Sequence, residues 1–244
     1  METLRNVFPI VGVVLSNALY LAPAPAVRIA HRQRRIGHFN AAPPALMLLS
    51  TTAWCFYALS VPNMYIFAAN APGVLASLAY VLLTLPLIPH AAPQRAAVQL
   101  VLVAGAAFKI CLWGAIVASG CDAASRSFTL GLYGSLLCVL MFAAPLSTMT
   151  TVIASANAAS IYAPLTAAQC VNCGTWTVYG LAIGDIWVWG PNACGSVLGL
   201  VQVALKLVYP SSVSSGAAAA ARPNDDDVRR RLKDLAAASD DNDD

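Results

Sequence analysis

This chain contains an internal repeat, because its sequence matches itself when it is shifted by 122 residues. The identities fall on Gly, Pro, Trp, Tyr and Asn, so they amount to more than apolar residues aligning with apolar residues. The matched pairs are Gly12–Gly134, Leu15–Leu137, Ala22–Ala144, Pro23–Pro145, Trp54–Trp176, Tyr57–Tyr179, Asn70–Asn192 and Gly73–Gly195. The chain is therefore predicted to hold two copies of one structural unit.

The composition indicates a membrane protein. Hydrophobic residues make up 59% of the chain and charged residues only 10%, whereas soluble domains carry about 25% charged residues. Only three acidic residues precede Pro210. Seven apolar segments are each long enough for a membrane span, which needs roughly 20 residues. They lie at about 7–27, 43–60, 65–87, 97–118, 128–151, 162–183 and 187–209.

The order of the spans fixes how the two repeats face the membrane. Because each unit has an odd number of spans, two units joined directly would have opposite orientations across the membrane. The fourth segment adds one more span, so that both units have the same orientation. We therefore predict an all-α membrane protein of seven transmembrane helices, with two parallel three-helix repeats joined by a linker helix. The predicted divisions are a first repeat at 7–90, a linker helix at 97–118, a second repeat at 128–209 and a disordered cytoplasmic tail at 210–244. One short helix is expected in the tail, from Asp227 to Ala238.

The linker at 28–42 is basic and carries Arg28, Arg32, Arg34 and Arg35. By the positive-inside rule it is cytoplasmic, which places the N-terminus outside and the C-terminus inside.

Polar side chains form one stripe in each repeat. Ser50, Trp54 and Tyr57 stand at i, i+4 and i+7, which is one helix face. Asn172, Trp176 and Tyr179 repeat this pattern. Polar groups are costly against lipid, so both stripes should face a cavity. Trp faces suit the C–H face of a sugar ring, and amides match hydroxyls because both donate and accept. The candidate substrate site is Trp54, Asn70, Trp176 and Asn192, with Ser50 and Asn172 beside them.

Other residues predict a hinge on the cytoplasmic side and a gate on the outer side. Pro23, Pro43, Pro145 and Pro164 fall at one level near the cytoplasmic side, where four kinks would make an inner hinge or gate. On the outer side, a hydrogen bond from Tyr57 or Tyr179 to Asp185 would close an outer gate. Pro191 directly precedes Asn192 and is expected to loosen its helix locally.

Ionisable and metal-binding groups are scarce within the spans. Lys109 lies mid-span in the linker helix, where we expect snorkelling or a contact at a subunit interface. No other ionisable residue lies within the repeats' spans away from their ends, which argues against proton coupling.

Cys170 and Cys173 form a C-x-x-C pair without a second ligand pair. We expect no metal, no cofactor, no enzymatic activity and no nucleic-acid partner.

Four stretches resemble the SWEET family of sugar transporters over about residues 8–209. They are LAPAP (21–25), LLSTTAWCFYAL (48–59), FAAPLST (142–148) and VNCGTWTVYGLAIGDIWVWGPNACGSVLGLVQ (171–202). The resemblance implies bidirectional, energy-independent sugar uniport by alternating access, a sugar substrate, and a homo-oligomer, often a trimer. It also implies that Ser16, Leu19, Cys138 and Met141 line the pocket. The Ser50/Asn172 pair and Met141 favour a monosaccharide over sucrose. We favour the plasma membrane as the location and leave an internal membrane open.

Other interpretations remain open. The chain could transport another small neutral solute, such as an amino acid. A seven-span receptor would share the orientation, but the repeat and the lack of long loops speak against it. A membrane scaffold without transport is a further alternative.

Overall fold

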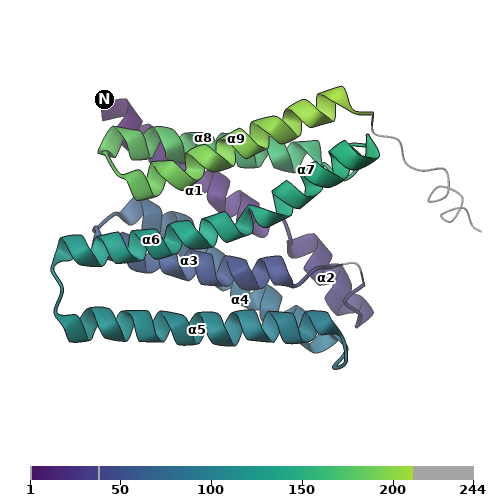
Figure 1. Cartoon of the computed structure of the whole chain (residues 1–244), viewed down its shortest axis with the longest axis horizontal. Helices are drawn as coiled ribbons and strands as arrows, with labels where there is room; N and C mark the ends of the chain where they lie inside the picture. The colour runs from purple at the N-terminus through teal and green to yellow at the C-terminus, as the bar shows by residue number, and fades with distance from the viewer. Residues whose placement is uncertain (1, 38, 211–244) are drawn as a thin grey trace, which may run out of the picture.

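The computed structural model describes residues 2–37 and 39–210. Residues 211–244 of the expected tail, including its short helix from Asp227 to Ala238, lie outside them. Within the described residues every regular element is helical (Figure 1). The elements are α1 (Glu2–Leu21), α2 (Ala24–Gln33), α3 (Ala42–Ser60), α4 (Met64–Thr84), the short 3-10 helix η1 (Leu85–Leu87), α5 (Pro93–Ser119), α6 (Ala123–Met141), α7 (Ala143–Ser155), α8 (Ala163–Ile183) and α9 (Ile186–Val208).

These helices form seven spans. The first is α1 continued by α2, and the fifth is α6 continued by α7. Six of the seven are long and apolar enough to cross a membrane by length and composition. The exception is α8, which has 21 residues but carries Gln169 and Asn172 among other polar side chains. The predicted fold class is therefore confirmed: three helical spans, a linker helix, and three more spans.

The prolines differ in part from the expectation of four kinks. Pro23 lies at the break between α1 and α2, and Pro145 follows the break at Phe142. Pro43 and Pro164 instead occupy the first turns of α3 and α8. A first-turn proline loses no intrahelical hydrogen bond, since its missing N–H would be unpaired there anyway. The expectation of a kink was wrong at these two positions.

Helix α9 runs without a break from Ile186 to Val208 through Pro191. The expected local loosening at Pro191 is thus not seen. Helix α4 likewise continues through Pro72.

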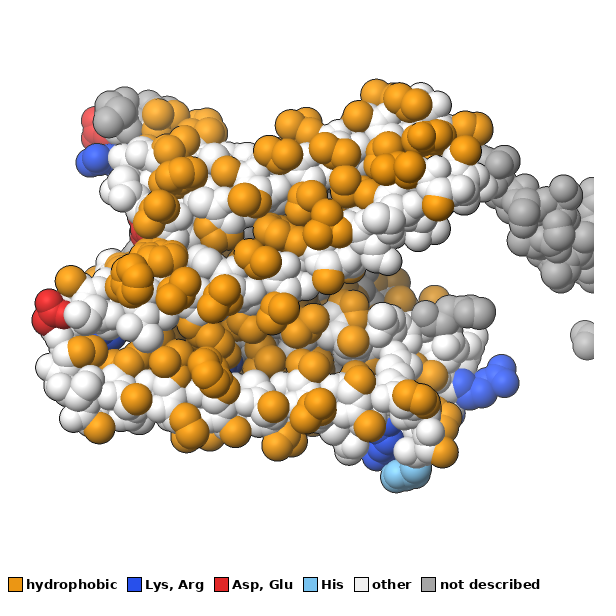
Figure 2. Space-filling view, in the orientation of Figure 1, with side chains coloured by type: hydrophobic (Ala, Val, Ile, Leu, Met, Phe, Trp, Pro, Cys, Tyr) orange, Lys and Arg blue, Asp and Glu red, His pale blue; other side chains and the backbone are white. Residues whose placement is uncertain are grey.

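The two repeats pack by exchanging neighbours. In each repeat the second and third spans pair, as α3 with α4 and α8 with α9. Helix α1 packs against α4 and against α8 of the other repeat, and α6 packs against α9 and against α3. The linker helix α5 lies on the outside against α3 (Figure 1). Apolar side chains cover much of the visible surface, as expected for a lipid-facing exterior (Figure 2).

Lys109 is directed into the protein rather than towards the membrane surface. Its Nζ donates to Thr52 Oγ1 at 2.6 Å and to the carbonyl oxygen of Leu49 at 3.3 Å. Gly105, one turn earlier, allows this approach, because a Cβ there would lie 2.3 Å from Leu49 Cδ1. Snorkelling is therefore wrong for Lys109, which instead ties the linker helix to α3.

Candidate functional site

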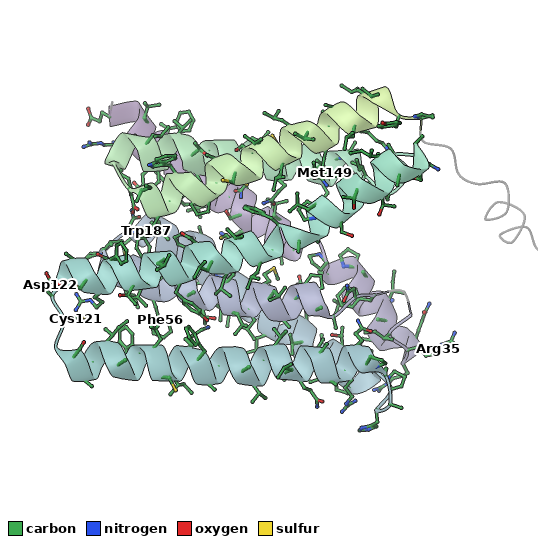
Figure 3. All side chains as sticks on the ribbon, viewed as in Figure 1. Arg35, Phe56, Cys121, Asp122, Met149 and Trp187 are labelled. Atoms are coloured by element: carbon green, nitrogen blue, oxygen red, sulfur yellow. The ribbon has the colours of Figure 1, made fainter. Side chains whose placement is uncertain are left out.

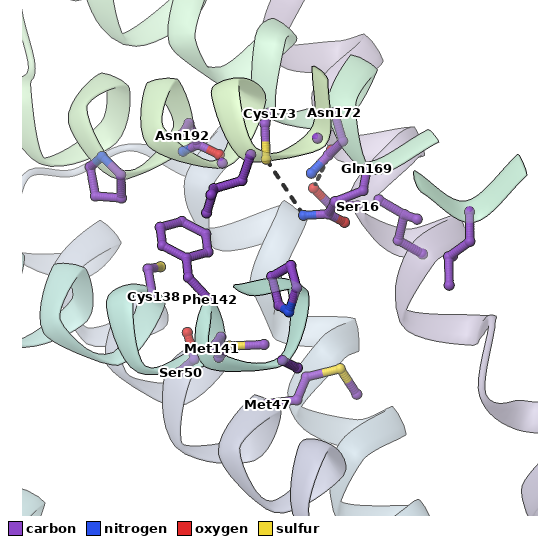
Figure 4. A pocket seen from close by; sticks show the side chains of 18 of the residues that line it. Ser16, Met47, Ser50, Cys138, Met141, Phe142, Gln169, Asn172, Cys173 and Asn192 are labelled. Carbon is purple, nitrogen blue, oxygen red and sulfur yellow. Dashed lines mark hydrogen bonds between the residues drawn. The ribbon is translucent and has the colours of Figure 1, made fainter. Parts of the chain in front are cut away.

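A cavity of about 590 Å³ lies between the two repeats. All ten residues predicted to contact a substrate line it: Ser16, Leu19, Ser50, Trp54, Asn70, Cys138, Met141, Asn172, Trp176 and Asn192. Figure 4 shows Asn192, Cys173 and Asn172 along one wall, with Ser50, Cys138 and Met141 along the other. No charged side chain is among the described residues that line the cavity. The site therefore suits a neutral ligand with many hydroxyl groups.

Each tryptophan is fixed by the first helix of the opposite repeat. Trp176 Nε1 donates to Ser16 Oγ at 3.0 Å, and Ser16 Oγ donates to Asn172 Oδ1 at 3.0 Å. Trp54 Nε1 contacts Cys138 Sγ at 3.4 Å. Ser16 and Cys138 are equivalent under the shift of 122 residues. The exchange of helices between repeats therefore orients both indoles in the same way.

Two glycines give the indoles their space. A Cβ on Gly12 would lie 2.8 Å from Trp176 Cε2, and a Cβ on Gly134 would lie 3.2 Å from Trp54 Cε2. Because these two glycines are equivalent in the repeat, each first helix offers a flat surface at the level of the opposite indole.

The two asparagines differ in their partners. Asn70 Oδ1 accepts a hydrogen bond from the Tyr20 hydroxyl at 3.1 Å. The equivalent of Tyr20 is Phe142, which has no hydroxyl, and Asn192 Oδ1 has no hydrogen bond from any residue in 2–37 or 39–210. Both amide nitrogens donate to the carbonyl one turn earlier, to Ile66 at 2.9 Å and to Val188 at 2.8 Å. Asn192 is therefore the asparagine with an acceptor free for a ligand.

One end of the cavity is closed by two hydrogen bonds between the repeats. The Tyr57 hydroxyl donates to Asp185 Oδ2 at 2.7 Å. In the equivalent position, Asn63 Nδ2 donates to the Tyr179 hydroxyl at 2.8 Å. Tyr57 is 2% exposed and Tyr179 is 4% exposed, so solvent is excluded at this end. Tyr57, Tyr179 and Asp185 were predicted from the sequence, but Asn63 was not, although the shift of 122 residues aligns it with Asp185.

Helix caps aim the groups that close this end. Asp185 caps α9, with Oδ1 accepting from the backbone N–H groups of Trp187 and Val188, which leaves Oδ2 for Tyr57. Asn63 caps α4 through Oδ1 and offers Nδ2 to Tyr179. Each tyrosine ring also meets the tryptophan one turn below it edge-on, with centroids 5.5 Å apart for Trp54–Tyr57 and 5.8 Å apart for Trp176–Tyr179.

The opposite end of the cavity is open. The lining there reaches Gln202 of α9 and Tyr162, whose side chain is 69% exposed. Figure 2 shows the molecule hollowed at this end, between α7 and α2. Pro23 and Pro145 line the cavity, whereas Pro43 and Pro164 do not. The helix breaks of the first and fifth spans therefore lie at the wall of the open half.

The lining residues that were missed from the sequence include Tyr20, Phe142 and Gln169. Gln169 Nε2 approaches Cys173 Sγ at 3.5 Å (Figure 4). The repeat could have found Tyr20 and Phe142, since they are equivalent positions one residue after Leu19 and Met141. Within the described residues, no group of His, Cys, Asp or Glu side chains could hold a metal ion.

The sequence model for "Sugar efflux transporter for intercellular exchange" matches the chain twice, at residues 6–90 and 128–213. Among similar proteins, "Bidirectional sugar transporter SWEET16" of Oryza sativa subsp. japonica is 30% identical over 201 residues, covering 82% of this chain and 61% of the relative. This chain thus spans about three fifths of that protein's length. "Sugar transporter SWEET1" of Dictyostelium discoideum is 27% identical over 213 residues, covering 87% of this chain and 96% of the relative.

The fold is also similar to a solved structure, that of a eukaryotic SWEET transporter. The TM-score is 0.75 at 22% sequence identity, over 84% of this chain and 96% of the other. The two matches of the family model coincide with the two three-span repeats and leave out α5. The chain therefore belongs to the family of sugar efflux transporters for intercellular exchange.

Proposed function

We propose that this protein is a bidirectional sugar uniporter that works by alternating access. The observation that carries the proposal is the uncharged cavity between the repeats, closed at the Tyr57–Asp185 end and open at the end of α2 and α7. A solute carrier needs a site that communicates with one side at a time, and repeat interfaces near the midplane supply such sites.

Sugar is the proposed substrate because of the groups that line the cavity. Trp54 and Trp176 offer apolar surfaces, while Asn70, Asn192 and Asn172 offer amides that pair with hydroxyls. Ser16, Leu19, Ser50, Cys138 and Met141 complete the proposed substrate site. A zwitterionic amino acid would leave its charges unpaired here, since no charged side chain is among the described lining residues. We propose a monosaccharide rather than sucrose, because the Ser50/Asn172 pair and Met141 are among the lining residues.

We propose that the structure is the inward-open state. Tyr57, Tyr179 and Asp185 form the outer gate, with Asn63 as the fourth member. Pro23 and Pro145 at the helix breaks act as the inner hinge, and Pro43 and Pro164 start the helices beside them. This orientation places the arginines at 28–35 in the cytoplasm and the N-terminus outside.

We propose that the chain is divided into the repeats at 7–90 and 128–209, the linker helix at 97–118, and a cytoplasmic tail at 210–244. Copies of the chain form a homo-oligomer, with a trimer as the form to test by mass in detergent. The plasma membrane is the proposed location, and imaging of the tagged protein tests this against an internal membrane.

Uptake of labelled sugar in cells that lack sugar transporters tests the function. We expect glucose to enter faster than sucrose, with uptake unchanged when the proton gradient is collapsed, since no Asp, Glu, His, Lys or Arg is among the described lining residues. Surface labelling confirms that the protein is present. If correctly targeted protein moves neither sugar, the sugar proposal is wrong, and a strict gradient requirement would indicate a coupled carrier.

A further inference from the structure

We propose that a second groove, between α2 and the start of α3, binds an anionic phospholipid. The groove has a volume of about 530 Å³. Its lining combines the polar Gln33 and Arg35 with the apolar Ile29, Phe39, Pro43 and Pro44. Polar and apolar walls in one groove fit a ligand with a charged head and a hydrocarbon chain.

The charge around this groove is strongly positive. Arg28, Arg32, Arg34 and Arg35 are all exposed, and within residues 2–37 and 39–210 none of their guanidinium groups bonds to another side chain. Arginine side chains form bidentate hydrogen bonds with phosphate, and juxtamembrane basic clusters attract anionic lipids.

No described carboxylate opposes these arginines. The acidic residues of the described chain are Glu2, Asp122 and Asp185, which begin α1, α6 and α9 at the other end of the molecule. Figure 3 shows this separation, with Asp122 at one end of the bundle and Arg35 at the other. The arginines therefore lack a counter-ion within the described protein, and a lipid phosphate would supply one.

The backbone holds Arg35 at the groove. Helix α2 ends at Gln33 and is capped by Arg34, which has a left-handed conformation with φ of 52°, and Gly37 follows with φ of 56°. The N–H groups of Arg34 and Arg35 donate back to the carbonyls of His31 and Ala30 at 3.2 Å each. This tight turn reverses the chain beside α2, so that Arg35 and Phe39 border the same groove.

The apolar wall distinguishes a lipid from a free anion. Ile29 lines the groove and is 55% exposed. A soluble phosphate would make no favourable contact with this apolar side chain, whereas the acyl chain of a lipid would pack against it. The groove also contains Pro23, which lines the central cavity as well. A bound lipid would thus contact the break between α1 and α2 and stabilise the position of α2.

Native mass spectrometry of the full-length protein in detergent tests this proposal. The protein is titrated with phosphatidylserine or phosphatidylcholine, and the bound fraction is compared. We expect several-fold more retained phosphatidylserine. Arg35→Gln should lower that retention about fivefold, the amount expected for one arginine near an anionic lipid surface. Ala26→Trp keeps the charge but fills the groove, and it should lower retention at least as much.

Two matched variants separate the groove from general charge. Arg126→Gln removes the same charge at the other end, and Arg32→Gln removes it near the groove but outside its lining. Arg126→Gln should have no effect, and Arg32→Gln a smaller effect than Arg35→Gln. Equal retention of both lipids, or equal losses in the three arginine variants, would overturn the proposal. Size-exclusion profiles confirm folding, and Ala26→Trp remains decisive should Arg35→Gln fail to fold.

Other occupants give different results. Inorganic phosphate that displaces phosphatidylserine at millimolar concentration would indicate a soluble anion instead. The chain's own acidic residues at 240–244 are a second candidate. If the wild type shows no lipid preference but the variant with asparagine at Asp240, Asp241, Asp243 and Asp244 does, then the tail occupies the groove and the lipid proposal is wrong. Lipid retention is measured without sugar, so its outcome is independent of the transport proposal.

Discussion

The hydroxyl of Tyr57 donates a 2.7 Å hydrogen bond to Oδ2 of Asp185 and thereby joins α3 of one repeat to the start of α9 in the other. The equivalent pair, Tyr179 and Asn63, makes the reciprocal connection at 2.8 Å, with the amide as donor. The two connections share a geometry but differ in charge, because one ends on a carboxylate and the other on an amide. Hydrogen bonds to charged groups contribute about 1.5–3 kcal/mol, and neutral ones about 1 kcal/mol.

Removing the Tyr57 hydroxyl should therefore open this end. With Tyr57→Phe, the population ratio of closed to open should fall roughly tenfold to a hundredfold, and with Tyr179→Phe about fivefold. Spin labels on the exposed Leu59 and Leu181 would report the change as a longer distance. Tyr65→Phe is the control, since it makes the same chemical change in a ring that only contacts Tyr179 edge-on. Equal effects of the Tyr57 and Tyr179 variants would show that the charge of Asp185 does not matter.

The central site should depend on Trp176 and Asn192. Trp176→Ala removes an aromatic wall and Asn192→Ala removes the free acceptor, so each should reduce labelled-sugar uptake to background while expression is retained. Trp113→Ala on α5 is the control, because that ring is 40% exposed outside the cavity. Normal uptake in both cavity variants would relocate the site.

Phe142→Tyr tests the difference between the two asparagines. The new hydroxyl should donate to Asn192 Oδ1, as Tyr20 does to Asn70 at 3.1 Å. Sugar would then compete with an internal hydrogen bond of about 1 kcal/mol, so KM for uptake should rise about fivefold. Phe128→Tyr makes the same change at an exposed position on α6 and should leave KM unchanged. An unaltered KM in Phe142→Tyr would mean that Asn192 Oδ1 does not contact sugar.

Gly12→Ala should destabilise the protein through Trp176. The new methyl group would lie 2.8 Å from the indole, which is held in place by Ser16, and overpacking of this kind costs about 1–3 kcal/mol. Thermal unfolding in detergent should show a lower Tm, with a smaller decrease for Gly134→Ala, where the distance is 3.2 Å. Gly114→Ala meets nothing within 4 Å and should keep or raise the Tm, since alanine favours helix. A normal Tm for Gly12→Ala would show that the indole can move aside.

Much of the cavity could be predicted because the repeat marks equivalent positions. Trp54, Trp176, Asn70 and Asn192 stood out as paired polar or aromatic residues in apolar segments, and the structure places all four around one cavity. Their role in binding remains a prediction. Helical periodicity also places Tyr57 above Trp54 without any knowledge of the other helices.

Contacts between helices could not be predicted from the sequence. Nothing in the period of α5 indicates that Lys109 reaches Thr52, because that contact depends on how α5 lies against α3. Whether Pro43 and Pro164 kink a helix depends on where α3 and α8 begin. If the predicted start of a helix is wrong by a few residues, a proline of the first turn is mistaken for one in the helix interior, where it would cause a kink. Asn63 was overlooked since an asparagine before a helix is an ordinary cap, and its second bond, to Tyr179, crosses between repeats.

The difference between Tyr20 and Phe142 has a consequence for how a ligand would sit. The two halves repeat one arrangement of spans, but Tyr20 carries a hydroxyl where the equivalent Phe142 has none, so the two sides of the pocket differ chemically. A sugar is itself chiral and presents different hydroxyls along its rim. A sugar rotated by 180° about the repeat axis would no longer place the same hydroxyl at the free acceptor, Asn192 Oδ1. One binding pose should therefore dominate, and the two repeats should contribute differently to binding.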